Sequence, residues 1–186
     1  FGFGRIGQMH GSNLFKHPKF NLKYVYDRDE KLAKKSERMF KAKSIKNYKT
    51  AFLDKSVGVI FIASSTPTHI NFIRDAALYK KTIFCEKPLD LDLNKIIKCR
   101  KYIKKFSPRI QIGFNRRYDP GHYYLKKSIE QKKIGTLQKI IITCRDPAPP
   151  PLAYLKTAGG IFKDMIIHDF DLIRFYLKND PIKEVF

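Results

Sequence analysis

The chain has 186 residues, of which 43% are hydrophobic, enough for one large domain or two small ones with a packed core. Its net charge is +21, but the lysines are spread over most predicted helices and no common nucleic-acid-binding signature occurs, so we expect no nucleic-acid partner. The three cysteines form no CxxC pair, so we expect no disulfide framework or metal site, and a reducing cytoplasm. No apolar run approaches the roughly 20 residues of a membrane span, so we expect no membrane partner.

A glycine motif of the form GxGxxG opens the chain, and a helical pattern follows it to about Lys16. In such a motif the first glycine permits a tight turn, the second lets the backbone approach a pyrophosphate, and the third allows close helix packing. The helix N-terminus then supplies amide donors for the phosphates. The predicted pyrophosphate contacts are Gly2, Gly4, Arg5, Ile6 and Gly7.

An acidic residue follows the next predicted strand, Leu22–Tyr26. This residue, Asp27, lies twenty residues after Gly7, where a dinucleotide-binding fold places the carboxylate that accepts the ribose hydroxyls. Asp27 favours NAD over NADP, because a 2′-phosphate would meet a carboxylate. The adjacent Arg28 is also a candidate contact and leaves some tolerance of NADP. The alternative is that Asp27 is only a turn residue.

Hydroxyl side chains follow the third predicted strand. A Lys-rich amphipathic helix is predicted over Glu30–Phe40, and the continuous apolar run Val57–Ala63 is typical of a central parallel strand. Ligands of doubly wound sheets bind beyond the carboxyl ends of such strands. The alternative is that Ser65 or Thr66 caps the helix that runs to about Tyr79, with Pro67 in its first turn, and both roles can hold at once. The candidate cofactor contacts are Ser64, Ser65, Thr66 and His69.

The next strand, Thr82–Cys85, ends in the triplet Glu86-Lys87-Pro88. A Lys-Pro bond can adopt the cis form, which would fix where the lysine points. A lysine directed into a crevice can hydrogen-bond a substrate hydroxyl or share its proton. A helix over Asp92–Phe106 and a strand over Arg109–Phe114 follow. This alternation of strands and helices predicts a parallel α/β sheet.

An acid–histidine pair stands out in the second half of the chain. Apolar residues over 161–172 recur at three- and four-residue spacing, which predicts a mostly buried helix after Gly159 and Gly160. Asp164 and His168 are four residues apart, so one helix would place them on the same face. A carboxylate that orients a histidine is a general-base arrangement. The alternative is a surface ion pair without chemistry.

Both ends of the chain have the character of interrupted elements. The glycine motif begins where a strand should already have preceded it, and residues 181–186 resemble the beginning of a strand. We therefore expect a fragment with a nucleotide-binding domain over residues 1–114 and a partial second domain over residues 115–186.

The ordered set of motifs resembles the Gfo/Idh/MocA oxidoreductase family. The resemblance covers essentially the whole chain. It rests on the glycine motif, Asp27, Glu86-Lys87-Pro88, the run Gly113–Pro120, the proline-rich run Arg145–Pro151 and the Gly159–Asp171 segment. The last two are far more specific than the glycine motif.

The resemblance implies a Rossmann domain followed by a domain with a large, mostly antiparallel sheet, through which such proteins commonly form tetramers. It implies NAD-dependent oxidation of a cyclitol's secondary alcohol, most closely that of an inositol, to a ketone. Lys87, Asp164 and His168 would be catalytic, Arg116 and Asp146 would also hold substrate hydroxyls, and Glu86 and Lys87 would also contact the cofactor. The alternatives are another cyclitol or sugar as substrate, surface ion pairs or phosphate contacts for Arg116 and Arg117, a turn role for Asp146, and an NAD-binding fragment without catalysis.

Overall fold

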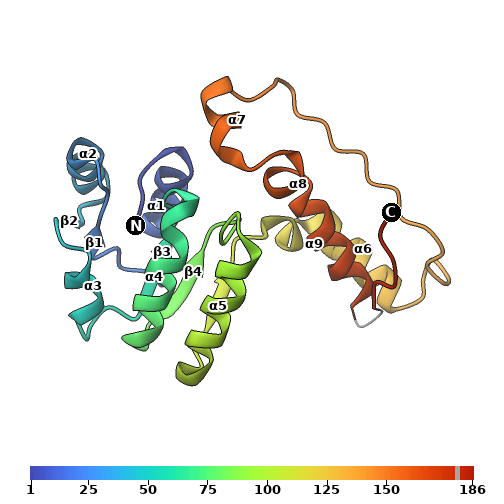
Figure 1. The fold of residues 1–186 in the computed structure, drawn as a ribbon, viewed down its shortest axis with the longest axis horizontal. Coiled ribbons are helices and arrows are strands. Elements are labelled where there is room, and N and C mark those ends of the chain that lie inside the picture. Colours follow the sequence, from blue (N-terminus) through green and yellow to red (C-terminus); the bar gives the residue numbers. More distant parts are fainter. Residues whose placement is uncertain (179–180) are drawn as a thin grey trace. The chain divides into compact units, whose positions relative to one another are not determined.

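Strands and helices alternate along residues 1–113, which form the first of two units in this computed structural model (Figure 1). The structure describes residues 1–178 and 181–186. The strands of the first unit are β1 (Tyr24–Val25), β2 (Lys43–Ser44), β3 (Val59–Ile62), β4 (Thr82–Cys85) and β5 (Ile110–Ile112). Its helices are α1 (Arg5–Lys16), α2 (Glu30–Phe40), α3 (Lys49–Leu53), α4 (Thr66–Leu78), α5 (Leu93–Ile103) and the short 3₁₀ helix η1 (Lys104–Phe106).

The strands pair in parallel, β1 with β2 and β3 with β4 and β5. Phe1 and Gly2 join these two groups. The Phe1 nitrogen donates to the Phe61 carbonyl (2.6 Å), the Ala63 N–H donates to the Phe1 carbonyl (2.8 Å), and the Gly2 N–H donates to the Tyr26 carbonyl (2.9 Å). The resulting order, β2-β1-(residues 1–2)-β3-β4-β5, is that of a doubly wound sheet. The predicted parallel α/β fold is confirmed.

Helices cover both faces of this sheet. The rings of Phe61 on β3 and Phe84 on β4 stack with centroids 3.9 Å apart, and the His10 ring of α1 lies 4.9 and 5.3 Å from them. Successive side chains of a strand point to opposite faces, so Ile60 points away from α1. It is buried in the core cluster that includes Ile73 of α4. Helices α1 and α4 therefore lie on opposite faces of the sheet.

Phe1 is packed into the core by aromatic contacts. Its ring centroid lies 5.4 Å from that of Tyr26, 5.4 Å from that of Phe52 and 5.2 Å from that of Phe72, each in an edge-to-face arrangement. Edge-to-face pairs of this kind add to the stabilisation that burial provides.

Residues 114–186 form a second unit, whose described residues make helices and irregular segments but no strand. Asp119 caps α6, since its carboxylate accepts the N–H groups of Gly121 (2.9 Å) and His122 (3.1 Å). His122 Nδ1 lies 2.6 Å from the Tyr176 hydroxyl, which connects α6 to α9. The helices are η2 (Asn115–Tyr118), α6 (Pro120–Glu130), α7 (Leu152–Ala158), α8 (Ile161–Asp164) and α9 (Ile167–Leu177).

Two predictions for this unit are wrong. The single helix expected over residues 161–172 is divided into α8 and α9, with Met165 and Ile166 between them. The strand expected at residues 181–186 does not form, and the side chains of Val185 and Phe186 are exposed. A strand needs a paired neighbour and a packed face, and the described residues of this unit offer that segment neither.

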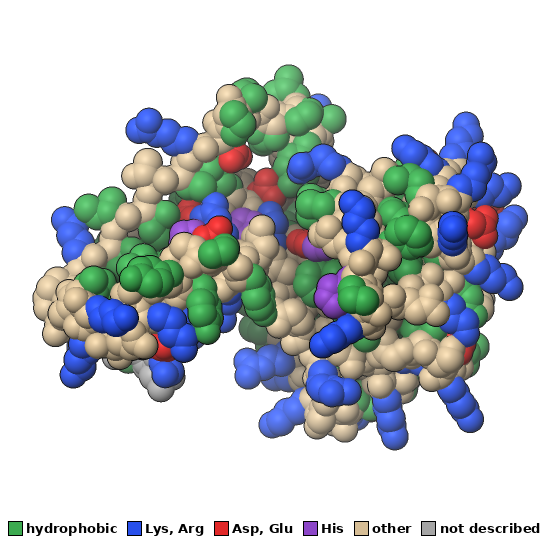
Figure 2. All heavy atoms as spheres, turned by 180° about the vertical axis from the view of Figure 1, so that it is seen from behind, with side chains coloured by type: hydrophobic (Ala, Val, Ile, Leu, Met, Phe, Trp, Pro, Cys, Tyr) green, Lys and Arg blue, Asp and Glu red, His purple; other side chains and the backbone are tan. Residues whose placement is uncertain are grey.

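The basic residues are dispersed. Figure 2 shows the Lys and Arg side chains scattered over the face drawn, with no single stripe. None of the helices in the described ranges combines the length and the apolar character that crossing a bilayer requires.

Candidate cofactor and active site

The three glycines of the N-terminal motif differ in what surrounds them. Gly2 has φ +83°, and a Cβ on it would lie 2.3 Å from the Ser64 Cα. A Cβ on Gly7 would lie 1.9 Å from the Gly2 carbonyl oxygen, whereas a Cβ on Gly4 would meet nothing within 4 Å. These surroundings match the tight turn, the close helix packing and the open approach that a dinucleotide-binding loop requires.

Helix α1 begins directly after Gly4 with its first N–H groups available. No side chain caps this end, and no acidic residue lies in the first turn. Arg5 is exposed and Ile6 is half-buried. A helix N-terminus of this kind favours an anion through its amide donors and its dipole.

Asp27 lies two residues after the end of β1 and holds the glycine loop through its carboxylate. One carboxylate oxygen accepts the Phe3 N–H at 2.6 Å and the other accepts the Asp29 N–H at 2.9 Å. Each oxygen retains a further lone pair that can accept a hydroxyl. Asp27 and the exposed Arg28 line a cavity of about 250 Å³, together with Lys34 and Lys46. Carboxylate and cationic side chains therefore line the same cavity.

The hydroxyl residues after β3 form a local network. The Ser64 and Thr68 hydroxyls lie 2.6 Å apart, and Thr68 donates to the Ser65 carbonyl. Ser65 occupies the N-cap position of α4, as the capping alternative predicted, but its side chain makes no capping hydrogen bond. Ser65 is exposed and Thr66, the first residue of α4, is half-buried.

His69 is buried, and its ring nitrogens lie 2.8 Å from the Pro88 carbonyl oxygen and 2.9 Å from the Ser64 carbonyl oxygen. These contacts tie the end of β3 to the segment after β4. They indicate that His69 positions these two segments. They do not support direct contact of His69 with a cofactor, which stays a prediction.

The triplet after β4 is held by a histidine that the sequence analysis missed. His10 Nε2 lies 2.6 Å from Glu86 Oε1, and the other Glu86 oxygen accepts the Lys87 N–H at 3.2 Å. A Cβ on Gly113 would lie 2.9 Å from the Glu86 carboxylate, so the glycine leaves room for that side chain. The Lys87–Pro88 bond is cis.

The acid and histidine of the second unit lie on different helices, which corrects the single-helix arrangement. Asp164 ends α8 and His168 lies in the first turn of α9. The Ile166 N–H donates to the Ile161 carbonyl, five residues back, and the His168 N–H donates to the Met165 carbonyl, three residues back. The hydrogen bonds between residues four apart, which a single helix would form, are therefore interrupted between Asp164 and His168.

Two aromatic residues that the sequence analysis missed contact this pair. The Tyr154 hydroxyl donates to Asp164 at 2.6 Å. The Phe114 ring packs edge-on against the His168 ring, with centroids 6.3 Å apart. Both contacts join segments that no local pattern connects.

The two arginines of the predicted substrate region form ion pairs. Arg116 donates to Asp169 and to the Cys144 sulfur, the latter at 3.1 Å. Arg117 donates both of its bonds to Asp171, at 2.7 and 2.6 Å, and this contact raises the pKa of Arg117. The ion-pair alternative is thus realised for both, while a substrate contact by Arg116 stays a prediction. Asp146 is exposed in the irregular segment before the proline run.

Together, the residues of the first unit fit a bound dinucleotide. Gly4 and the N-terminus of α1 offer an open, uncapped phosphate site, and Asp27 offers a hydroxyl acceptor.

The chain is similar to known proteins over its whole length. A family model described as an oxidoreductase family with an NAD-binding Rossmann fold matches residues 1–114, and the C-terminal domain model of the same family matches residues 122–186. Myo-inositol 2-dehydrogenase from Thermotoga maritima is 39% identical over 186 residues, which is 100% of this chain and 55% of that protein. Inositol 2-dehydrogenase from Rhizobium meliloti is 35% identical over 181 residues, covering 97% of this chain and 54% of that protein.

Solved structures of inositol dehydrogenases are also similar to this chain. A myo-inositol dehydrogenase from Corynebacterium glutamicum has a TM-score of 0.91 at 35% identity, covering 96% of this chain and 54% of that one. A scyllo-inositol dehydrogenase from Lactobacillus casei, solved with NAD(H) and scyllo-inositol, has a TM-score of 0.81 at 28% identity, covering 94% and 54%. The chain spans about half the length of the curated relatives it matches. It belongs to the Gfo/Idh/MocA family of oxidoreductases, and its first unit is the NAD-binding Rossmann fold of that family.

Proposed function

We propose that this protein oxidises the secondary alcohol of myo-inositol to the 2-keto inositol, with NAD as the hydride acceptor. The observation that carries the proposal is the match of all 186 residues to the myo-inositol 2-dehydrogenase of T. maritima. A tetrameric, cytoplasmic enzyme without a nucleic-acid or membrane partner is part of the same proposal and rests on the family resemblance alone.

The cofactor would be held by the first unit. The amides of the glycine loop and of the first turn of α1 would bind the pyrophosphate, and Asp27 would accept the ribose hydroxyls. Ser64, Ser65 and Thr66 follow β3 and would line the same crevice. When bound, NAD accepts the hydride that leaves the alcohol carbon.

Proton transfer is assigned to His168. Its ring would take the hydroxyl proton as the hydride leaves, so that the alcohol becomes a ketone. Asp164, itself held by Tyr154, would orient the histidine or accept a substrate hydroxyl. Lys87 would donate a hydrogen bond to the reacting oxygen and stabilise the charge that develops on it.

Arg116 and Asp146 would hold further hydroxyls of the ring. A guanidinium carries five N–H donors, so Arg116 can pair with Asp169 and still donate to a substrate. A site built from such groups rejects analogues that lack the hydroxyls.

NADH formation tests the proposal. The assay offers myo-inositol, scyllo-inositol, glucose and no substrate, with NAD and then NADP. It is run on this chain and on a chimera in which the unmatched part of the T. maritima relative is joined to it. Turnover of myo-inositol with NAD is the expected result. If the chimera bound NAD but turned over none of the substrates, the chain would be an NAD-binding protein without this catalysis.

Another cyclitol is the second candidate substrate. The relative from L. casei was solved with scyllo-inositol and shares the fold of this chain. Turnover confined to scyllo-inositol would preserve the roles assigned to the cofactor and proton-transfer residues and would change the substrate.

Replacing Asp27 with serine is expected to reduce the preference for NAD over NADP by about tenfold or more, because the carboxylate no longer repels a 2′-phosphate. Arg28 and Lys46, which line the same cavity, would then face that phosphate. Isothermal titration calorimetry with both cofactors measures the ratio of the two dissociation constants.

Asp92→Ser is the matched control, since the Asp92 carboxylate accepts the Asn94 N–H two residues on, just as the Asp27 carboxylate accepts the Asp29 N–H. It should leave the ratio unchanged. A ratio that also stays unchanged in Asp27→Ser would remove Asp27 from cofactor discrimination.

A further inference from the structure

His10 connects helix α1 to the sheet through its ring. Gly7, His10 and Gly11 are three and four residues apart, so they lie on the same side of α1, where both glycines are buried. The His10 ring packs against those of Phe61 and Phe84, with centroids 4.9 and 5.3 Å away. The two phenylalanine rings therefore limit the directions in which the ring nitrogens of His10 can point.

The Glu86 carboxylate is enclosed by three neighbours. One of its oxygens lies 2.6 Å from His10 Nε2, and the other accepts the Lys87 N–H at 3.2 Å. Gly113 passes so close that a Cβ on it would lie 2.9 Å from the carboxylate. The Glu86 side chain is only 17% exposed, and a carboxylate with so little access to water needs hydrogen-bond donors. Because an ionised carboxylate only accepts hydrogen bonds, His10 is the donor of this contact.

The residues on both sides of Lys87 are held by histidines that come from opposite faces of the sheet. Before Lys87, the Glu86 side chain is held by His10 of α1. After it, the Pro88 carbonyl oxygen lies 2.8 Å from His69 Nδ1 of α4. His69 contacts the backbone directly, whereas the effect of His10 on Lys87 passes through one side chain, the Glu86 carboxylate. This makes the His10 contact the one that a single substitution can remove.

We propose that His10 is a positioning residue for the oxidation: it holds the Glu86 carboxylate, which holds the Lys87 amide, so that the Lys87 ammonium is directed to the reacting oxygen. The inference rests on the proposed function, from which it takes the role of Lys87. Misplacing a catalytic group by about 1 Å can cost about 10²-fold in rate. Without the His10 donor, the Glu86 carboxylate turns towards water and releases the Lys87 amide.

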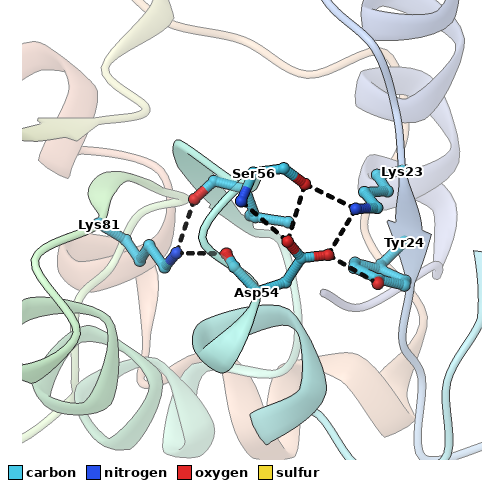
Figure 3. A network of polar contacts seen from close by, with 6 residues as sticks. Lys23, Tyr24, Asp54, Ser56 and Lys81 are labelled. Carbon is cyan, nitrogen blue, oxygen red and sulfur yellow. Dashed lines mark hydrogen bonds and ion pairs between the residues drawn. The ribbon is translucent and has the colours of Figure 1, made fainter.

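A second polar network of the first unit surrounds another carboxylate (Figure 3). Asp54 accepts hydrogen bonds from Lys23 at 2.5 Å and from the Tyr24 hydroxyl at 2.8 Å. Lys81 donates to the Asp54 carbonyl at 2.7 Å. Asp54 precedes β3 and Lys81 precedes β4, whereas Lys87 follows β4, and these strands are parallel. The Asp54 network therefore lies at the opposite end of the sheet from Lys87 and provides a control for the loss of a hydrogen bond to a carboxylate.

The test separates the hydrogen bond of His10 from the packing of its ring. His10→Gln keeps an N–H donor near the place of Nε2, whereas His10→Phe keeps a ring against Phe61 and Phe84 but has no donor. In the chimera, His10→Phe is expected to lower the turnover number by about 10- to 100-fold. His10→Gln is expected to stay within about threefold of the parent chimera, and both variants keep the NAD dissociation constant within about threefold. His10→Ala, which also lacks a donor, takes the place of His10→Phe should that variant not fold.

A double substitution shows whether His10 acts through Lys87. If it does, His10→Phe lowers turnover in the parent chimera but lowers it no further when Lys87→Ala is already present. Tyr24→Phe is the matched control, because it removes one hydrogen bond to Asp54 and keeps the ring, so it lowers the Tm without changing turnover. Equal turnover in His10→Phe and His10→Gln, or an equal loss from His10→Phe with and without Lys87, would overturn the proposal.

Amide exchange tests the hold on Lys87 without any turnover. In this chain alone, the Lys87 amide should exchange at least about tenfold faster in His10→Phe than in His10→Gln. The Ile83 amide is the internal reference, since it donates to the Arg109 carbonyl at 2.9 Å. Equal exchange of the Lys87 amide in the two variants would also overturn the proposal. A parent chimera that binds NAD but turns over no substrate overturns the proposed function instead, and exchange at Lys87 then decides whether His10 holds this residue.

Discussion

Alanine in place of Lys87 or of His168 is expected to lower the turnover number by about 10²- to 10⁴-fold, the usual contribution of a positioned proton-transfer group. The NAD dissociation constant should stay nearly unchanged, because the glycine loop and Asp27 are the proposed cofactor contacts that contribute most of the binding. Turnover is measured by NADH formation in the chimera. Affinity is measured by calorimetry, since the chain has no tryptophan to report binding.

Two exposed residues serve as matched controls. Lys95→Ala on α5 and His17→Ala after α1 change the same residue types away from the proposed chemistry, and both should leave turnover and affinity unaltered. Unchanged turnover in Lys87→Ala or His168→Ala would remove that residue from catalysis. Parallel loss of Tm, NAD affinity and turnover would assign it a structural role.

The first unit could be predicted from sequence because its signals are local. Helix α2 and strand β4 have the bounds that their patterns predicted. Asp29 caps α2 by accepting the Lys31 N–H at 2.8 Å, and three of the four residues of β4 are apolar. Gly2 adopts a positive φ, as the tight turn predicted for the first glycine of the motif requires. The very short β2 and α3 were not predicted, because elements of two and five residues show no periodicity.

The second unit could not be predicted to the same extent. The apolar spacing of residues 161–172 is compatible with one helix, and nothing in it indicates the interruption at Met165. The pairs that organise the candidate sites are also invisible to local patterns. His10 and Glu86 are 76 residues apart, and Arg116 and Asp169 are 53 apart. Only the folded chain brings such partners together.

Alanine at Gly7 is expected to destabilise the fold by about 3 kcal/mol or more and to abolish measurable NAD binding. Two effects compete at this position. Alanine stabilises a helix interior relative to glycine by about 1 kcal/mol. Against this, its Cβ would lie 1.9 Å from the Gly2 carbonyl oxygen and 2.8 Å from the Gly2 carbonyl carbon, and neither backbone atom can rotate away as a side chain would. Overpacking against fixed atoms costs more than the propensity gain, so the clash decides the sign.

Alanine at Gly4 separates binding from stability. Its Cβ would meet nothing within 4 Å, so urea unfolding should change by no more than about 1 kcal/mol, the scale of an N-cap change. The same methyl group would occupy the space through which the backbone approaches a pyrophosphate, so NAD affinity should fall at least about tenfold. Gly58→Ala, with equally open surroundings on the strand side of the unit, should change neither quantity. Wild-type stability in Gly7→Ala would contradict the packing argument, and wild-type affinity in Gly4→Ala would show that the loop does not hold the phosphates.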